Sequence, residues 1–216
     1  MKKFFLSLVL CSIAAASFAQ LPIKFGATAG LNVSNATISS GSISISPDWK
    51  AGFQVGVIAD LAITPQISIL PELIFSQKGY KSSYSEDGGS YTESSTVNYL
   101  TLPVNVAYKF DLGTAGTIFP FAGPYVGYAL SGSWKEEWKD GDQSGKDSEK
   151  IKIGSGDDDD IKALDFGVNV GVGYQFENYL FRLQYNIGLS NIANVPSGYD
   201  ASLKTKNLAV SVGYFF

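Results

Sequence analysis

The sequence predicts an all-β protein, a single eight-stranded antiparallel up-and-down transmembrane β-barrel. Apolar and polar residues alternate with a period of two in eight segments, which is typical of strands with two different faces. The connections alternate between short and long, and aromatic residues collect near the strand ends on the apolar side. Alternation alone also fits a soluble barrel, so the outward orientation of the apolar face depends on the other two observations and on the N-terminus.

The N-terminus predicts a cleaved signal peptide over residues 1–19. Lys2 and Lys3 precede an apolar run from Phe4 to about Ala16, and small residues at positions 17 and 19 complete a cleavage site. The run is too short to span a bilayer as a helix. The expected mature chain, residues 20–216, is therefore exported through the inner membrane.

Composition argues against several kinds of function. The chain has no histidine, and its one cysteine lies in the predicted leader, so catalytic sites built on either residue are excluded, as are histidine metal ligands. Without the leader, 14 basic residues face 20 acidic ones, a net charge of −6 that makes nucleic-acid binding improbable. The remaining polar residues are spread along the strands, so we expect no enzyme activity and no cofactor.

The first four predicted strands cover residues 23–33, 49–61, 67–78 and 97–110. In the first three, the odd-numbered residues are mostly apolar and the even-numbered ones mostly small or polar, and in the fourth the even-numbered residues are apolar. Pro71 interrupts the third strand, and because proline cannot donate a ladder hydrogen bond, we expect a bulge or local distortion there.

The last four predicted strands cover residues 118–130, 165–176, 179–190 and 206–216. Residues 165–190 give the clearest pattern: Val168 and Leu183 belong to an unbroken apolar side, whereas Arg182 and Gln184 lie on the other. Only two residues, 177–178, separate these two strands, which is typical of a β-hairpin.

The connections fall into two classes. Residues 62–66, 111–116 and 177–178 are short turns, whereas residues 34–48, 79–95, 131–160 and 191–205 are predicted to be long loops. Outer-membrane barrels have short periplasmic turns and long extracellular loops. About ten residues per strand, at ~3.3 Å each and tilted by ~45°, span roughly 24 Å, close to the height of the apolar band of such barrels.

Aromatic residues on the apolar side gather near both strand ends, as in the interfacial girdles of membrane barrels. Tyr108, Phe110 and Tyr214 lie near the short turns, and Trp49 lies near a long loop. We expect the final strand, with Phe216 at its end, to be recognised by the barrel-assembly machinery.

Four segments carry a family resemblance: 71–80 (PELIFSQKGY), 99–103 (YLTLP), 121–128 (FAGPYVGY) and 165–176 (DFGVNVGVGYQF). They resemble the PorT-like outer membrane protein beta-barrel domain family of Bacteroidetes. The resemblance implies an eight-stranded, porin-like outer-membrane barrel, and one branch of the family is linked to protein secretion. It implies no shared catalytic residues.

Charged residues on the polar side of the strands predict a network inside the barrel. Unpaired charges in a narrow barrel are costly, so these side chains should pair, and Arg182 with Glu72 or Asp60 is the preferred pair. A packed network is favoured over a gated ion path, because eight strands leave room for little more than side chains. The residues expected in the network are Arg182, Glu72, Asp60, Lys24, Lys109 and Asp165.

The longest predicted loop, 131–160, offers two candidate contact sites. The acidic run Asp157, Asp158, Asp159 and Asp160 lacks the spacing of a calcium loop, so a solvated acidic surface is favoured over a divalent-cation site. Trp134 and Trp138 are expected either to anchor a partner or glycan, or to form the tip of a hairpin that rests on the outer leaflet.

We therefore expect an outer-membrane scaffold whose loops contact partners outside the cell. Alternatives are a narrow or gated channel and a secretion-system accessory barrel, and a secreted lipocalin-like barrel is less favoured because it would expose Arg182 to water. The expected partners are outer-membrane lipid and lipopolysaccharide, the assembly machinery, and an extracellular or secretion-system protein.

Overall fold

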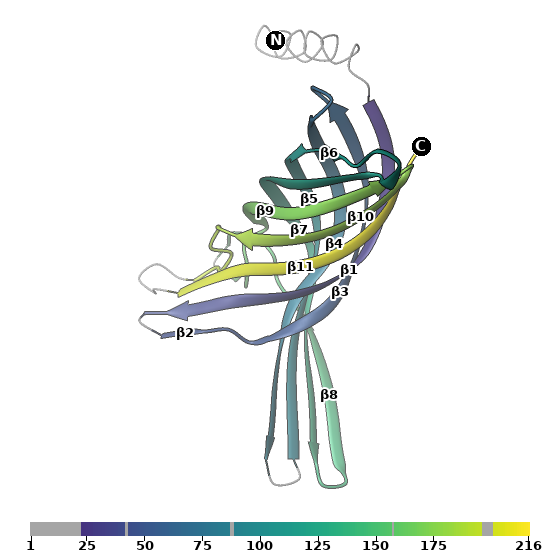
Figure 1. Ribbon diagram of the computed structural model, residues 1–216. Helices are drawn as coiled ribbons and strands as arrows, with labels where there is room; N and C mark the ends of the chain where they lie inside the picture. Colours follow the sequence, from purple (N-terminus) through teal and green to yellow (C-terminus); the bar gives the residue numbers. More distant parts are fainter. Residues whose placement is uncertain (1–22, 42, 87–88, 157, 196–200) are drawn as a thin grey trace, which may run out of the picture.

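A computed structural model describes residues 23–41, 43–86, 89–156, 158–195 and 201–216. Long antiparallel strands close into a barrel, and some of them continue into a long sheet beyond one end (Figure 1). The predicted signal peptide lies outside the described residues. In the described ranges, no helix has the length and apolarity needed to cross a bilayer.

Eight strands form the barrel wall within the described ranges. Each pairs with its neighbours in chain order, and β1 also pairs with β11, which closes the ring. The strands are β1 (Ile23–Ser40), β3 (Asp48–Ala62), β4 (Ile67–Glu86), β5 (Gly89–Tyr108), β7 (Thr117–Asp140), β9 (Leu164–Phe176), β10 (Tyr179–Gly188) and β11 (Ala201–Phe215).

Shorter elements attach to this wall. Strand β2 (Ile43–Ile45) pairs with β1, whereas β6 (Phe110–Asp111) and β8 (Gln143–Lys150) pair with β7. A 3₁₀ turn, η1 (Gly113–Ala115), lies in the β6–β7 connection. We call the end of the barrel with the short connections 63–66, 109–116 and 177–178 the turn end, and the opposite end the loop end.

The apolar side of the strands points outward. Val168, Leu183 and Val210 are 37%, 46% and 59% exposed, whereas Arg182 is only 3% exposed. An outward apolar wall around a polar interior is the arrangement of a membrane barrel, so the predicted fold class is confirmed. The lipocalin-like alternative requires the reverse orientation and is wrong.

The lumen is filled in three layers. At the turn end a cluster of apolar side chains that includes Leu70, Phe119 and Leu180 closes the barrel (the turn-end cluster). Buried polar residues occupy the middle. At the loop end a second cluster includes Tyr99, Ile151 and Ile161 (the loop-end cluster). An eight-stranded wall leaves an interior that side chains can fill, and here they do.

Two of the predicted loops are mostly strand. Residues 79–86 continue β4, residues 89–95 belong to β5, and residues 131–150 continue β7 and add β8, so that four paired strands project from the loop end (Figure 1). We call residues 80–86, 89–96, 133–140 and 143–150 the stalk. These strands were not predicted from the sequence, because both faces of the stalk carry polar residues and the apolar alternation on which strand prediction depends is absent.

The other two predicted loops are shorter than expected. Strand β1 continues to Ser40, and β11 begins at Ala201. The register of β4 against β5 is the same on both sides of Pro71, so the described strand has no bulge there, but Leu70 and Pro71 have no paired residue in β3, which is a local distortion of the kind expected. Register shifts occur instead between Trp49 and Gln54 of β3 and at Asn98/Tyr99 of β5.

Candidate functional site

Arg182 and Glu72 form an ion pair across the lumen, directly above the turn-end cluster. Arg182 Nη1 and Nη2 donate to Glu72 Oε1 and Oε2, both at 2.6 Å, and both side chains are almost fully buried. Asn105 Nδ2 also lies 3.4 Å from Glu72 Oε1. Of the two partners suggested for Arg182 by the sequence, the structure therefore selects Glu72. A two-pronged pair of this kind fixes geometry as well as charge.

Asp60 pairs with a different cation, Lys109, near the turn end. Lys24 lies opposite Asp60 in the β1–β3 register, but its side chain is exposed. The expectation that Lys24 joins the interior network is wrong. At the end of a strand a long side chain can leave the lumen and keep its ammonium group in water, which costs less than burial.

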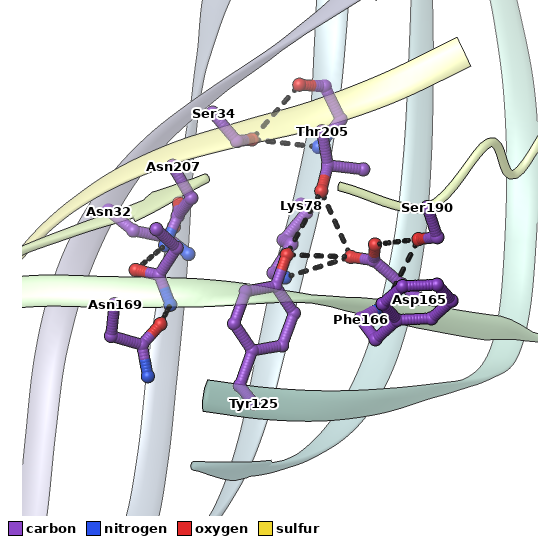
Figure 2. A network of polar contacts seen from close by, with 12 residues as sticks. Asn32, Ser34, Lys78, Tyr125, Asp165, Phe166, Asn169, Ser190, Thr205 and Asn207 are labelled. Atoms are coloured by element: carbon purple, nitrogen blue, oxygen red, sulfur yellow. Dashed lines mark hydrogen bonds and ion pairs between the residues drawn. The ribbon is translucent and has the colours of Figure 1, made fainter. Parts of the chain in front are cut away.

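Asp165 is the centre of a third group, near the loop end (Figure 2). Its carboxylate accepts hydrogen bonds from Ser190 Oγ at 2.8 Å, Thr205 Oγ1 at 2.9 Å and the Tyr125 hydroxyl at 3.2 Å. Lys78 Nζ lies 3.6 Å from Asp165 Oδ2. The Asp165 charge is thus balanced by one cation and three neutral donors, as a buried carboxylate requires.

Lys78 has a second set of neighbours. Its Nζ lies 5.0 Å from the ring centroids of both Tyr99 and Tyr125, so two aromatic faces share the ammonium charge with Asp165. Sequence reasoning placed Lys78 inside the barrel but did not pair it. The partners are far apart in sequence, and the stagger between β4 and β9 decides which residues meet.

A chain of asparagines extends from the Arg182–Glu72 pair through Asn105 and was not anticipated. Asn186 Nδ2 donates to Asn169 Oδ1 at 2.7 Å, and longer contacts of 3.4 Å connect Asn169 to Asn105 and Asn207 to Asn186. Figure 2 shows Asn169 and Asn207 facing the lumen beside Asn32. The amides donate and accept across four strands, so the middle layer acts as a cross-link between walls.

Residues 151–156 and 158–163 cover the mouth of the barrel. Ile151 and Ile161 are 6% and 5% exposed and pack on Val97, Tyr99 and Ala129. The cavity that remains beneath them holds about 30 Å³, room for one water molecule. The loop end is therefore closed by apolar side chains.

The acidic run lies at the edge of this cover, with Asp157 outside the described residues. Asp159 Oδ2 accepts from the Gly156 amide at 2.7 Å, and Asp160 Oδ2 accepts from the Lys152 amide at 2.8 Å. Both carboxylates thus stabilise local turns. In the described part of the chain, no group of three or more acidic, histidine or cysteine side chains is arranged to hold a metal ion.

The two tryptophans of the stalk differ in exposure. Trp134 packs against the loop-end cluster and meets Tyr80 edge-on, with ring centroids 5.9 Å apart. Trp138 is 45% exposed, and its ring lies over Gly145. Neither lies at the hairpin tip, which is residues 141–142.

Burial, and then the Glu93 charge, raises the pKa of the Tyr80 hydroxyl, which stays neutral at physiological pH.

Several solved structures match this chain over nearly the whole of their own length. The chain is similar to Ail of Yersinia pestis, with 10% identity, coverage of 88% of this chain and 98% of that chain, and a TM-score of 0.38. It is also similar to Neisserial surface protein A, with 16% identity, coverage of 89% and 97%, and a TM-score of 0.41. For OprG of Pseudomonas aeruginosa the identity is 12%, the coverage 92% and 98%, and the TM-score 0.40.

The family comparison covers most of the chain. No curated protein matches the sequence. The family model described as "Outer membrane protein beta-barrel domain" matches residues 18–194, which include seven of the eight wall strands. This match agrees with the outward apolar wall and the filled polar lumen. The chain therefore belongs to the outer membrane protein beta-barrel domain family and is a protein of the cell outer membrane.

Proposed function

We propose that this barrel is a closed, non-catalytic scaffold that anchors the stalk in the outer membrane and presents it outside the cell. The observation that carries the proposal is the filling of the lumen by three successive layers, two apolar and one polar. A solute path would have to displace all three. The stalk, in contrast, has most of its surface free.

The stalk suits presentation because its backbone is already ordered. Its four strands pair in continuous register from Tyr80 to Glu86 on β4 and from Asp140 back to Ser133 on β7. A partner that binds a pre-ordered surface does not have to compensate for the conformational entropy of a flexible loop. This favours a contact role for the stalk over a passive connection.

Conductance tests the closed state. The refolded protein should show no steady current in planar lipid bilayers at moderate voltage. A variant with a shortened stalk serves as the control: residues 82–93 are replaced by Asn-Gly between the paired residues Lys81 and Ser94, and residues 135–148 likewise between Trp134 and Glu149. It should be equally silent. A large, steady conductance in the wild type contradicts the proposal.

A narrow or gated channel is the second candidate. It is supported by the polar middle layer, where Ser76 and Gln184 have buried polar atoms without a protein partner among the described residues. Water can satisfy such atoms. Brief voltage-dependent openings in the same bilayer experiment would favour this candidate over the closed scaffold.

The lysines of the stalk support the lipopolysaccharide partner. Five of them lie on the side continuous with the lipid-facing wall, where ammonium groups can pair with anionic headgroups. They are Lys81, Lys135, Lys139, Lys146 and Lys150. Changing Lys135 and Lys139 to Gln should weaken binding of lipopolysaccharide micelles, and more strongly at low salt.

The remaining proposed relationships depend on the sequence motifs. The assembly machinery is the proposed partner of β11 and the residue that follows it, where Tyr214 and Phe216 are exposed aromatic residues. Export by a signal peptide is a proposal supported by the N-terminal sequence. A Bacteroidetes origin and a secretion role like that of the PorT-like branch are proposals supported by the resemblance alone. Loss of secretion after gene deletion, restored by the wild type and not by the shortened-stalk variant, would support the secretion role.

A further inference from the structure

The stalk is a sheet with two chemically different faces. Residues directly opposite each other in antiparallel strands point to the same side, and alternate residues along a strand point to opposite sides. The register therefore assigns each stalk residue to one face. The face that contains Tyr80 and Trp138 continues the lumen side of the wall, and we call it the inner face. The other, the outer face, continues the lipid side.

Acidic residues collect on the inner face. Six carboxylates lie there, and the register places no lysine or arginine of the described stalk among them. All five stalk lysines lie on the outer face, where the one acid, Glu137, pairs with Lys146 at 3.0 Å. The six inner-face acids are Glu86, Glu93, Glu136, Asp140, Asp147 and Glu149.

This segregation has an electrostatic cost. Glu93 lies directly opposite Glu136, and Glu136 directly opposite Asp147, so three carboxylates stand side by side on adjacent strands. Like charges in such positions destabilise a sheet. Exchanging one of these acids with a lysine of the outer face would remove the repulsion. A row that repels itself is stabilised when a cation from another molecule lies across it.

The inner face also carries exposed aromatic rings. Tyr84, Tyr91 and Trp138 occupy one row across three strands and are 62%, 40% and 45% exposed. They line a shallow depression of about 260 Å³ near the tip, together with Glu86 and Asp140, and Lys139 of the outer face closes one edge. Aromatic faces beside carboxylates are the groups that bind ammonium and guanidinium ions.

We propose that the inner face of the stalk binds a basic segment of a polypeptide, with arginine or lysine side chains placed on the aromatic row and against the carboxylates. This inference deepens the proposed function and rests on it. The length of the charged surface selects the occupant. From Tyr80 to Glu86 the acidic and aromatic rows cover roughly 20 Å at ~3.3 Å per residue, so a chain with several cations fits and a single small cation does not.

Peptide binding to the full-length protein in detergent micelles tests this inference. The probe is a fluorescein-labelled peptide of alternating arginine and serine, ten residues long, measured by fluorescence anisotropy in about 50 mM salt. Glu93→Gln with Glu136→Gln should weaken binding by about three- to tenfold, because two exposed charge pairs are lost. Trp138→Ala, which changes no charge, should weaken it by about two- to fivefold.

Glu137→Gln is the matched control. It removes the same charge one residue from Glu136 but on the outer face, so the affinity should change by less than about twofold. Heat-modifiable migration on gels shows that each variant retains a folded barrel. Failure of the wild type to bind the peptide overturns the inference. So does an affinity that survives either inner-face change, or one that falls equally with Glu137→Gln.

The bilayer and peptide experiments fail independently. A conducting barrel that still binds the peptide through the inner face removes the closed-scaffold function and leaves the stalk site. A barrel that does not conduct and does not bind the peptide keeps the closed-scaffold function and removes the stalk site. A labelled oligoglutamate peptide should not bind, and equal binding of both peptides overturns the role of charge.

Discussion

At the scale of single residues, stability depends on pairs that the sequence could only partly indicate. Arg182 and Glu72 lie on polar positions of their predicted strands, so their burial in the lumen followed from the alternation once the apolar side was placed outward. Their meeting depends on the stagger between strands that are not neighbours. The Lys78–Asp165 pair depends on it too. The alternation therefore placed most of the interior charges, with Lys24 as an exception, but did not predict all of their partners.

Breaking the Arg182–Glu72 pair should destabilise the barrel strongly. Glu72→Gln leaves the guanidinium buried without a counter-charge, which costs about 3–5 kcal/mol. The double variant Glu72→Gln with Arg182→Met should lose less free energy of unfolding than Glu72→Gln alone, because no unpaired charge remains buried. Urea unfolding in detergent micelles measures both. Glu137→Gln, which breaks the exposed pair with Lys146, should cost no more than about 1 kcal/mol. Equal costs for the buried and exposed pairs would contradict this account.

Two glycines of β9, Gly171 and Gly173, leave room for the rings of Phe121 and Phe119 on β7. Phe119 lies opposite Gly173, and a Cβ on Gly173 would come within 2.2 Å of the Phe119 ring. We expect Gly173→Ala to displace the ring from the turn-end cluster and to destabilise the barrel by about 1–3 kcal/mol. Gly127→Ala is the control, since its nearest contact would be an ordinary 3.4 Å. Urea unfolding should separate the two variants, and a neutral Gly173→Ala would show that the ring has room to move.

At the scale of elements, the sequence predicted the wall strands and missed the stalk. The wall strands alternate because lipid contacts one face and the lumen contacts the other. The stalk has water on both sides, so Ser, Thr, Glu and Lys fill both of its faces and the period-two hydropathy signal disappears. The stalk differs between its faces in charge rather than in hydropathy. Glu136 lies on the acidic inner face and its neighbour Glu137 on the lysine-rich outer face.

Relief of repulsion within the inner face should stabilise the stalk. Glu136→Lys places a cation between Glu93 and Asp147 and should slow amide hydrogen exchange across residues 133–140, by an amount equivalent to about 0.2–1 kcal/mol. Glu137→Lys should do the reverse, because it adds a sixth lysine to the outer face and removes the partner of Lys146. The same sign for both variants would refute the two-faced charge pattern.

At the scale of the whole molecule, the orientation of the barrel was predictable and the closure of its mouth was not. Outward aromatic girdles and the two classes of connection set the orientation. Closure depends on Ile151 and Ile161, which lie in a stretch dominated by glycine and charge and so resembled a solvated loop. Contacts with residues of other strands turn this stretch into a cover.

Removal of this cover should open only the first of the three layers. In a Cys11→Ser background, a cysteine at Ser95 lies beneath the cover and one at Ser76 lies in the middle layer, and both positions are buried. The double variant Ile151→Gly with Ile161→Gly should speed the reaction of the cysteine at position 95 with a charged thiol reagent by about tenfold or more. Without these two side chains, fewer apolar contacts are lost when the cover opens locally, so it opens more often. The cysteine at position 76 should react slowly with or without the cover, since the polar network lies on one side of it and the turn-end cluster closes the other end. Fast reaction at both positions would show that the cover alone closes the lumen, and the layered account would then fail.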